Sequence, residues 1–315
     1  MIIIEDTYMT LLQMNYALTI ARIGSINKAA EQLFVSQPTL TSALKDLEEE
    51  IGIKIFHRTG RGVSTTNEGM EFLRYVRQVY QQYELLQSKY NGNENIKRKF
   101  GVSTQHYSFV DKAFVEMVKQ FDTLKYDFAI RETKTARVIQ DVGEQISEIG
   151  ILYRSEYNSR IIDMLLQKND LEFHKLMVCQ AYIYLWRGHP LAKESSITLE
   201  QLTDYPCLMF EQGQEDSSYL SEEILTEYEY PRIIRANDRA TMLNLMVGLL
   251  GYTLCSGIIC EELNGTDFIA IPYQEDEYHR NSSMEIGYII KKNTVLSEFG
   301  EVFLQEIRKY LKITV

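Results

Sequence analysis

The fold is decided by the stretch GSINKAAEQLFVSQPTLTSALKDLE, residues 24–48. It predicts two short helices joined by a tight turn. Small and apolar residues at helical spacing give the first helix a close-packing face (Ala29, Ala30 and Leu33). In the second helix, apolar residues recur at steps of four, three and four and form one buried stripe (Leu40, Leu44, Leu47 and Ile51). Ser36 is placed to cap this helix, and Pro38 falls in its first turn, where no N–H donor is missed.

The opposite face of the second helix is short and mostly polar. Its side chains can reach base edges or phosphates in a DNA major groove, as a recognition helix requires (Gln37, Pro38, Thr39, Ser42 and Lys45). On its own, this spacing is equally compatible with a helical hairpin whose outer face is merely solvated.

The residues that follow favour the DNA-binding interpretation. Residues 57–62, HRTGRG, form a glycine-rich basic loop between two short predicted strands, and the loop carries Arg58 and Arg61. Thr65 and Glu68, three residues apart, predict a capping box that opens the next helix. Two helices followed by a basic hairpin make a winged helix-turn-helix.

Residues 11–70 resemble the DNA-binding domain of the LysR-type transcriptional regulators. The match rests on motifs in the family's order and spacing: Ala29-Ala30, Val35-Ser36-Gln37-Pro38, Leu47-Glu48, Phe56-x-Arg58 and Thr66-x-x-Gly69. The resemblance implies double-stranded promoter DNA as a partner, with RNA polymerase as a further one. It assigns DNA contacts to Asn27, Ser36, Gln37, Pro38, Thr39, Ser42, Lys45, Arg58 and Arg61.

The charge of the chain is distributed unevenly. The net charge is −11, which by itself argues against nucleic acid as a partner. Residues 1–98 hold 11 Lys and Arg and 11 Asp and Glu, whereas residues 99–315 hold 22 and 33. We therefore expect DNA affinity to come from a few placed cations and helix N-termini, and not from a broad basic patch.

A long helix is predicted after the wing, over residues 67–92. Apolar and aromatic residues at a and d spacing form a seam on it, which we expect to mediate dimerisation (Leu73, Val76, Tyr80 and Tyr83). Packing of this seam on its own chain is the alternative. The family resemblance favours an antiparallel dimer, and a dimer of dimers on DNA.

From residue 97 onward, short apolar runs alternate with amphipathic helices, which predicts parallel sheets. This order resembles the family's effector-binding domain, a two-lobed fold like the type II periplasmic binding proteins. The predicted fold class is thus α/β, with a winged helix-turn-helix over residues 9–66, a linker helix and an effector-binding domain over residues 97–315. Lobe one is expected over residues 99–171 and 272–315, and lobe two over residues 172–271.

Ligands of such sheets bind beyond the carboxyl ends of the strands. Polar residues lie at four such junctions: Ser103, Thr104, Gln105, Thr133, Gln212 and Asp238. The resemblance implies a small-molecule co-inducer at the first junction, where hydroxyl and amide groups suit a carboxylate or another polar group. The alternative is that these residues cap helices, which is the favoured interpretation for Thr133 and Asp238.

Other classes of function lack motifs. No glycine-rich phosphate loop, nucleophile elbow or metal-ligand spacing occurs, so we expect no enzyme, no cofactor and no metal. The cysteines, Cys179, Cys207, Cys255 and Cys260, lie in apolar runs and read as buried free thiols, with a thiol redox switch as the alternative. A solute-binding protein for transport would need a signal peptide or lipid anchor. The sequence shows neither of these and no membrane-spanning run, so the expected location is the cytoplasm.

Overall fold

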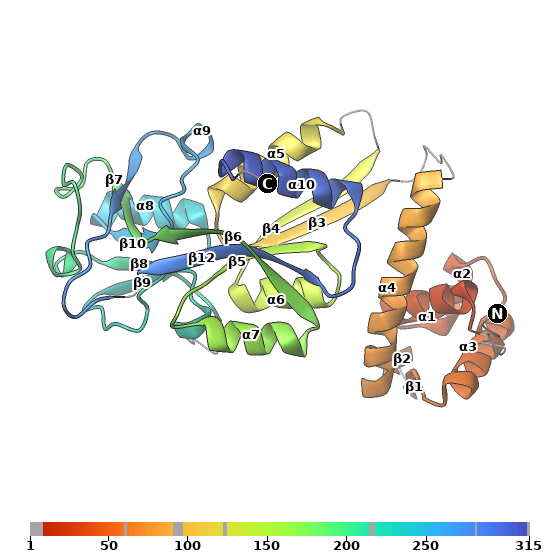
Figure 1. Ribbon diagram of the computed structural model, residues 1–315. Helices are drawn as coiled ribbons and strands as arrows, with labels where there is room; N and C mark the ends of the chain where they lie inside the picture. The colour runs from red at the N-terminus through yellow and green to blue at the C-terminus, as the bar shows by residue number, and fades with distance from the viewer. Residues whose placement is uncertain are drawn as a thin grey trace, which may run out of the picture. The chain divides into compact units, whose positions relative to one another are not determined.

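A computed structural model describes residues 9–59, 62–90, 97–121, 125–213, 218–280 and 282–313. The chain forms two compact units, Met1–Asn93 and Glu94–Val315. The first unit contains α1 (Leu11–Ile23), α2 (Ile26–Gln32), α3 (Gln37–Ile51), β1 (Phe56–Thr59), β2 (Gly62–Thr65) and α4 (Asn67–Tyr90) (Figure 1). Strands β1 and β2 pair in an antiparallel hairpin after the helix-turn-helix. The predicted winged helix-turn-helix is confirmed.

The helices of the first unit begin and end where local chemistry dictates. The Ser36 hydroxyl accepts a hydrogen bond from the backbone N–H of Thr39 at 3.2 Å and thereby caps α3. Helix α1 ends at Gly24, whose φ of 70° is left-handed and suits glycine. The backbone of Gly62 comes so close to this end that a Cβ on it would lie 2.3 Å from the carbonyl oxygen of Gly24. Only glycine therefore allows the wing to pack against the end of α1.

The predicted capping box at Thr65 and Glu68 is wrong by one residue. The hydroxyl of Thr66 accepts from the backbone N–H of Gly69 at 2.7 Å and donates to the carbonyl oxygen of Lys54 at 2.5 Å. A Cβ on Gly69 would lie 2.2 Å from the carbonyl oxygen of Ile55. Thr66 and Gly69 thus seat the first turn of α4 directly on the segment between α3 and β1, which gives the motif Thr66-x-x-Gly69 a physical basis.

Glu48 plays the matching role at the other end of that segment. Its side chain is buried and one carboxylate oxygen accepts from the backbone N–H groups of Ile55, at 2.8 Å, and Phe56, at 3.2 Å. The other oxygen accepts from the ammonium of Lys54 at 2.8 Å. Glu48 therefore ties the recognition helix to the start of the wing.

Helix α4 corrects the predicted dimerisation seam. Leu73 and Val76 are buried within their own unit, at 3% and 2% exposure, and Leu73 belongs to the core of the winged domain. They are therefore unavailable to a second chain. Tyr80 and Tyr83 are half-buried, and their rings lie 6.0 Å apart. The exposed apolar side chains of this helix are Met70, Tyr75, Val79 and Leu86.

The second unit contains two five-stranded sheets. The first has the order β4-β3-β5-β12-β6 (Figure 1). Its strands are β3 (Arg98–Thr104), β4 (Tyr126–Glu132), β5 (Ile149–Arg154), β6 (Leu171–Gln180) and β12 (Ser283–Lys291). Helices α5 (Ser108–Lys119) and α10 (Glu298–Tyr310) cover one face, and α6 (Thr135–Gly143) and α7 (Ser159–Lys168) the other (Figure 1).

The second sheet has the order β11-β7-β10-β8-β9. Its strands are β7 (Tyr182–Trp186), β8 (Cys207–Phe210), β9 (Ile233–Ala236), β10 (Tyr252–Cys255) and β11 (Phe268–Pro272). Helix α8 (Arg239–Leu249) packs on one face of this sheet through Met242 and Met246, and the short helix α9 (Glu261–Asn264) follows β10. The expectation of parallel sheets is only partly correct, because β12, β7 and β11 run antiparallel to their neighbours.

The expected lobe boundary at residues 171 and 172 also needs correction. Strand β6 pairs along its whole length with β12 and therefore belongs to lobe one. The chain first crosses at Ala181, and it returns between Tyr273 and Ser282. The two crossings are hydrogen-bonded to each other, from Ala181 N–H to Ser282 and from Tyr273 N–H to Ala181. Among the described residues, no helix is long and apolar enough to span a membrane.

Candidate functional site

The outer face of α3 presents the predicted recognition residues together. Gln37, Pro38, Thr39, Ser42 and Lys45 are all exposed, as is Asn27 in the first turn of α2. The Gln37 amide donates to the hydroxyl of Thr41 at 2.8 Å, which holds this long side chain against the helix while leaving its carbonyl oxygen free to accept. Lys45 forms an exposed ion pair with Glu49 at 3.2 Å, a contact that a phosphate can displace at little cost.

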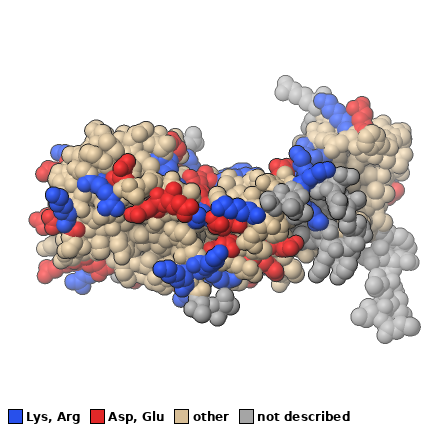
Figure 2. All heavy atoms as spheres, turned by 90° about the horizontal axis from the view of Figure 1, so that it is seen from above, with Lys and Arg blue, Asp and Glu red and all other residues tan. Residues whose placement is uncertain are grey.

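Two further predicted DNA contacts stay predictions. Arg61 lies outside the described residues, and so does the side chain of Arg58. Ser36 is exposed, but its hydroxyl caps α3 and also meets the Thr39 hydroxyl at 2.7 Å. Charge on the larger unit is mixed in sign on the face that Figure 2 shows, with acidic and basic side chains interspersed.

The first predicted effector junction is buried inside lobe one. Ser103 is fully buried, and its hydroxyl donates to Asp141 at 2.7 Å and lies 2.8 Å from the Ser147 hydroxyl. Thr104 is equally buried, and its hydroxyl donates to the backbone carbonyl of Gln105 at 2.8 Å. Both hydroxyls therefore serve internal bonds, and neither residue lines the cavity described below.

The other predicted residues organise the contact between the lobes. Gln105 donates to the Thr135 hydroxyl at 2.6 Å and accepts from the backbone N–H of Tyr153 at 3.1 Å. Gln212, from lobe two, accepts from the backbone N–H of Thr135 at 3.1 Å. The backbone N–H of Thr133 donates to Thr104 at 2.9 Å. Asp238 accepts from the backbone N–H of Thr241 at 2.8 Å and so caps α8, in agreement with the capping alternative.

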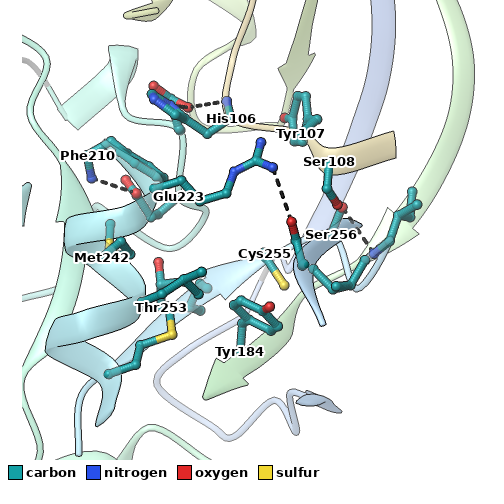
Figure 3. Close-up of a pocket in the computed structure, with 18 of the residues that line it drawn as sticks. His106, Tyr107, Ser108, Tyr184, Phe210, Glu223, Met242, Thr253, Cys255 and Ser256 are labelled. Atoms are coloured by element: carbon teal, nitrogen blue, oxygen red, sulfur yellow. Dashed lines mark hydrogen bonds and ion pairs between the residues drawn. The ribbon is translucent and has the colours of Figure 1, made fainter. Parts of the chain in front are cut away.

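A cavity lies between the two lobes, beyond the carboxyl ends of β3, β8 and β10 (Figure 3). Its volume is about 80 Å³. Lobe one contributes the segment His106-Tyr107-Ser108 at the start of α5, and lobe two contributes β7, β10 and α8. The apolar wall is formed by Tyr184, Phe210, Met242, Leu243, Met246 and Met284. This small, mostly apolar space with a few polar groups has the character of a ligand site.

Three polar atoms that line this cavity are buried without a hydrogen bond of normal geometry among the described residues. They are the hydroxyl of Tyr184, the hydroxyl of Thr253 and one carboxyl oxygen of Glu223. Tyr184 and Thr253 are directly paired across β7 and β10, so both side chains project from the same face of the sheet. Because buried polar atoms are nearly always satisfied in folded proteins, this group indicates a missing ligand or water.

His106 joins the lobes at the mouth of the cavity. Its ring stacks on Phe210 at 3.7 Å between centroids, and its Nδ1 lies 2.8 Å from a carboxylate oxygen of Glu222. The same oxygen accepts from the backbone N–H of His106. Burial alone opposes protonation of the imidazole, but the hydrogen bond and charge of Glu222 raise the pKa of His106. The pair is therefore poised to be charged near neutral pH.

Arg239 forms a second bridge. From the start of α8, its guanidinium donates to Asp111 at 2.9 Å and to Glu132, both of which belong to lobe one. Burial raises the pKa values of Asp111 and Glu132 despite the opposing charge of Arg239. Both basic side chains of the cavity, His106 and Arg239, are thus already paired with carboxylates.

Sequence reasoning missed these residues because it searched only the ends of predicted strands. Two adjacent glutamates, Glu222 and Glu223, in a segment that is otherwise apolar (Ile224-Leu225) were the available signal. The neighbouring thiol Cys255 also lines the cavity. Burial raises the pKa of Cys179 to about 11 and that of Cys255 to about 12, and it raises the pKa of Cys207 further. All four cysteines are free.

Metal ligands do not gather in the part of the chain that the structure describes, where no group of three or more His, Cys, Asp and Glu side chains could hold an ion.

Comparison with known proteins gives consistent matches over both units. Residues 11–70 match the model of the bacterial regulatory helix-turn-helix protein of the lysR family, and residues 115–312 match the LysR substrate binding domain. The HTH-type transcriptional regulator AlsR of Bacillus subtilis is 25% identical over 89% of this chain and 90% of its own length. The transcriptional activator CmpR of Synechocystis is 24% identical over 94% of this chain and 93% of its own length.

Solved structures share the fold. Full-length OxyR from Pseudomonas aeruginosa superposes with a TM-score of 0.64 at 18% identity and covers 96% of both chains. Full-length CbnR in complex with its target DNA superposes with a TM-score of 0.53 at 14% identity and covers 96% of this chain and all of that one.

Proposed function

The chain belongs to the LysR family of DNA-binding transcriptional regulators, which join a helix-turn-helix domain to an effector-binding domain, and on this premise we propose how it works. Its winged domain reads promoter DNA through the outer face of α3, and a small molecule in the cavity between the lobes changes the response. One observation carries the first half: the exposed polar face of α3 coincides with the family's sequence motif Val35-Ser36-Gln37-Pro38.

An electrophoretic mobility shift tests this proposal. The probe is the DNA immediately upstream of the protein's own coding region, with a scrambled duplex of the same composition as control. Specific binding at physiological salt supports the proposal and excludes a scaffold or a transport protein. Equal affinity for both duplexes contradicts it.

Gln37→Ala should reduce discrimination between the two duplexes. A side chain that contacts base edges contributes roughly 1–3 kcal/mol of specificity, which corresponds to a loss of about five- to a hundredfold in the affinity ratio. The matched control is Gln32→Ala, which removes an exposed glutamine from the end of α2. An unchanged ratio for Gln37→Ala would remove this side chain from the interface.

Lys45→Ala should behave differently. If its ammonium meets a phosphate, the variant weakens binding to both duplexes about equally and lowers the slope of log affinity against log salt by about one per subunit. Titration at several salt concentrations measures this slope. A selective loss on the specific duplex alone would instead assign Lys45 to base recognition.

Self-association is the next part of the proposal. We propose that the exposed side of α4, with Tyr75, Val79 and Leu86, pairs two chains, in place of the buried Leu73 and Val76. Isolated apolar side chains are common on surfaces, but a row of three on one helix face that the rest of the unit leaves uncovered suits a helix–helix interface. Dimers of dimers on DNA, and contact with RNA polymerase, are the further partners that this assignment predicts.

A redox switch at the cysteines is the second candidate, and the structure favours it less. The reactive form of a cysteine is the thiolate, and burial raises the pKa values of Cys179 and Cys255 and so disfavours that form. Loss of the DNA response after alkylation of the native protein would reinstate this candidate.

A further inference from the structure

The cavity between the lobes allows its ligand to be narrowed to a chemical class. Resting on the proposed function, we infer that this cavity binds a small molecule with a positively charged amino group on a short apolar body, and that Glu223 is the residue that recognises the amino group. The carboxylate-binding role expected from the sequence thus gives way to the opposite ligand charge.

Glu223 is placed as a recognition residue. Its side chain is 2% exposed and lines the cavity (Figure 3). One carboxyl oxygen accepts from the backbone N–H of Phe210 at 2.8 Å, which fixes the orientation of the group. The other oxygen is buried and has no hydrogen-bond partner among the described residues. A carboxyl group held at one oxygen and unsatisfied at the other offers a ligand one strong acceptor.

The charge around the cavity favours a cation. The two basic side chains are already engaged, His106 with Glu222 and Arg239 with Asp111 and Glu132. Counting Glu223, four carboxyl groups surround two basic side chains. An anionic ligand would have to displace one of these ion pairs or remain unpaired in a buried space, which is costly. An ammonium group gains a partner without breaking any of them.

The rest of the cavity fits a short apolar body. The hydroxyls of Tyr184 and Thr253 can each accept one further hydrogen bond from the same ammonium or from a neighbouring group. The methionine side chains of α8, Met242 and Met246, supply an adaptable apolar wall. A volume of about 80 Å³ limits the ligand to a few non-hydrogen atoms.

The protonation of Glu223 makes this inference testable. Burial and the adjacent Glu222 raise the pKa of Glu223 to about 8, so the empty site holds a mostly neutral carboxyl at pH 7. The titratable and charged groups that act on it, or on which it acts, are Glu222, Arg235, Tyr107, Tyr153 and Cys207. An ammonium ligand should pair with the ionised form. Binding at pH 7 should therefore release about 0.9 proton per ligand, falling to about 0.1 at pH 9.

The experiment uses three probes of equal length, butylamine, butan-1-ol and butyrate, at up to about 10 mM, because a ligand of so few atoms binds weakly. Isothermal titration calorimetry of the full-length protein in two buffers of different ionisation enthalpy gives affinity and proton release together. We expect butylamine to bind at least tenfold more tightly than the other two, and its affinity to rise about tenfold from pH 7 to pH 9. Glu223→Gln should weaken butylamine binding at least tenfold and abolish the pH dependence.

Glu229→Gln is the matched control, because it changes an exposed glutamate in the same segment and should leave binding unaltered. Thermal unfolding and the mobility shift without ligand verify that each variant is folded and still binds DNA. Tighter binding of butyrate or butan-1-ol, no binding of any probe, or an unaltered Glu223→Gln variant would overturn the inference. Intact DNA binding in that case would leave the proposed function standing, whereas absent DNA binding by the wild type would count against the proposed function alone.

Discussion

Val76→Asp should unfold the N-terminal unit, whereas Val79→Asp should leave it folded. Val76 is 2% exposed within a single chain, and Val79, one helical turn later, is 48% exposed. A carboxylate at the buried position loses its hydration without gaining a partner, and we expect a loss of about 3–5 kcal/mol in the free energy of unfolding. Such a loss approaches the total stability of a small domain.

The second variant tests assembly on the same helix. An aspartate at Val79 stays in water in the monomer, so the stability of the unit should change by less than about 0.5 kcal/mol. In the proposed dimer it becomes buried, and sedimentation should show a shift toward monomer. Chemical denaturation followed by circular dichroism measures the first effect and analytical ultracentrifugation the second. If Val76→Asp stays folded and dissociates instead, the sequence-based seam is correct and the packing described above is wrong.

Glu48→Ala should destabilise the winged domain by about 2–4 kcal/mol. The substitution leaves the backbone N–H groups of Ile55 and Phe56 without their acceptor in a buried segment, and each such group costs about 1–3 kcal/mol. The exposed ion pair with Lys54 should add little, because the ammonium of Lys54 is largely in solvent. Urea denaturation at neutral pH measures the loss.

Two matched variants isolate the cause. Glu48→Gln keeps a side-chain oxygen that can accept both backbone bonds, so it should recover most of the stability. Glu49→Ala removes an exposed neighbour that pairs only with Lys45 and should be close to neutral. A Glu48→Gln variant as unstable as Glu48→Ala would mean that the negative charge, and not the acceptor, holds the wing to α3.

The winged domain could be predicted from the sequence because its signals are local. The cap at Ser36, the leucine stripe of α3 and the hairpin loop are each specified within a few residues, and the structure has all of them. The capping box failed by one residue because Thr65 and Thr66 are chemically equivalent candidates. Only the contact of Gly69 with Ile55, set by tertiary packing, selects Thr66.

The dimerisation seam and the effector site failed for non-local reasons. Heptad spacing identifies an apolar face of α4 but not which part of it the rest of its own unit covers, and Leu73 and Val76 are covered. Likewise, Ser103 ends a strand as expected, yet its hydroxyl bonds to Asp141, 38 residues away in sequence. The cavity joins side chains from β7, β10, α8 and residues 222–223, and no periodicity brings those segments together.

The correction at β6 has the same origin. Its apolar run was assigned to the second lobe because it leads directly into β7, but β12 pairs with it from more than 100 residues later in the chain. Where sequence neighbours and spatial neighbours differ, as at this crossing, strand identity can be predicted but sheet membership cannot.

Hydroxyl-radical footprinting of the full-length protein on the DNA upstream of its own coding region tests the central claim most directly. Two winged domains that read DNA through α3 should protect two half-sites on one face of the duplex, with centres separated by one or more turns of about 10 base pairs. Gln37→Ala should weaken both protections while Gln32→Ala keeps them. Protection of neither half-site by the wild-type protein, or an unchanged pattern with Gln37→Ala, would contradict DNA recognition by this face of α3.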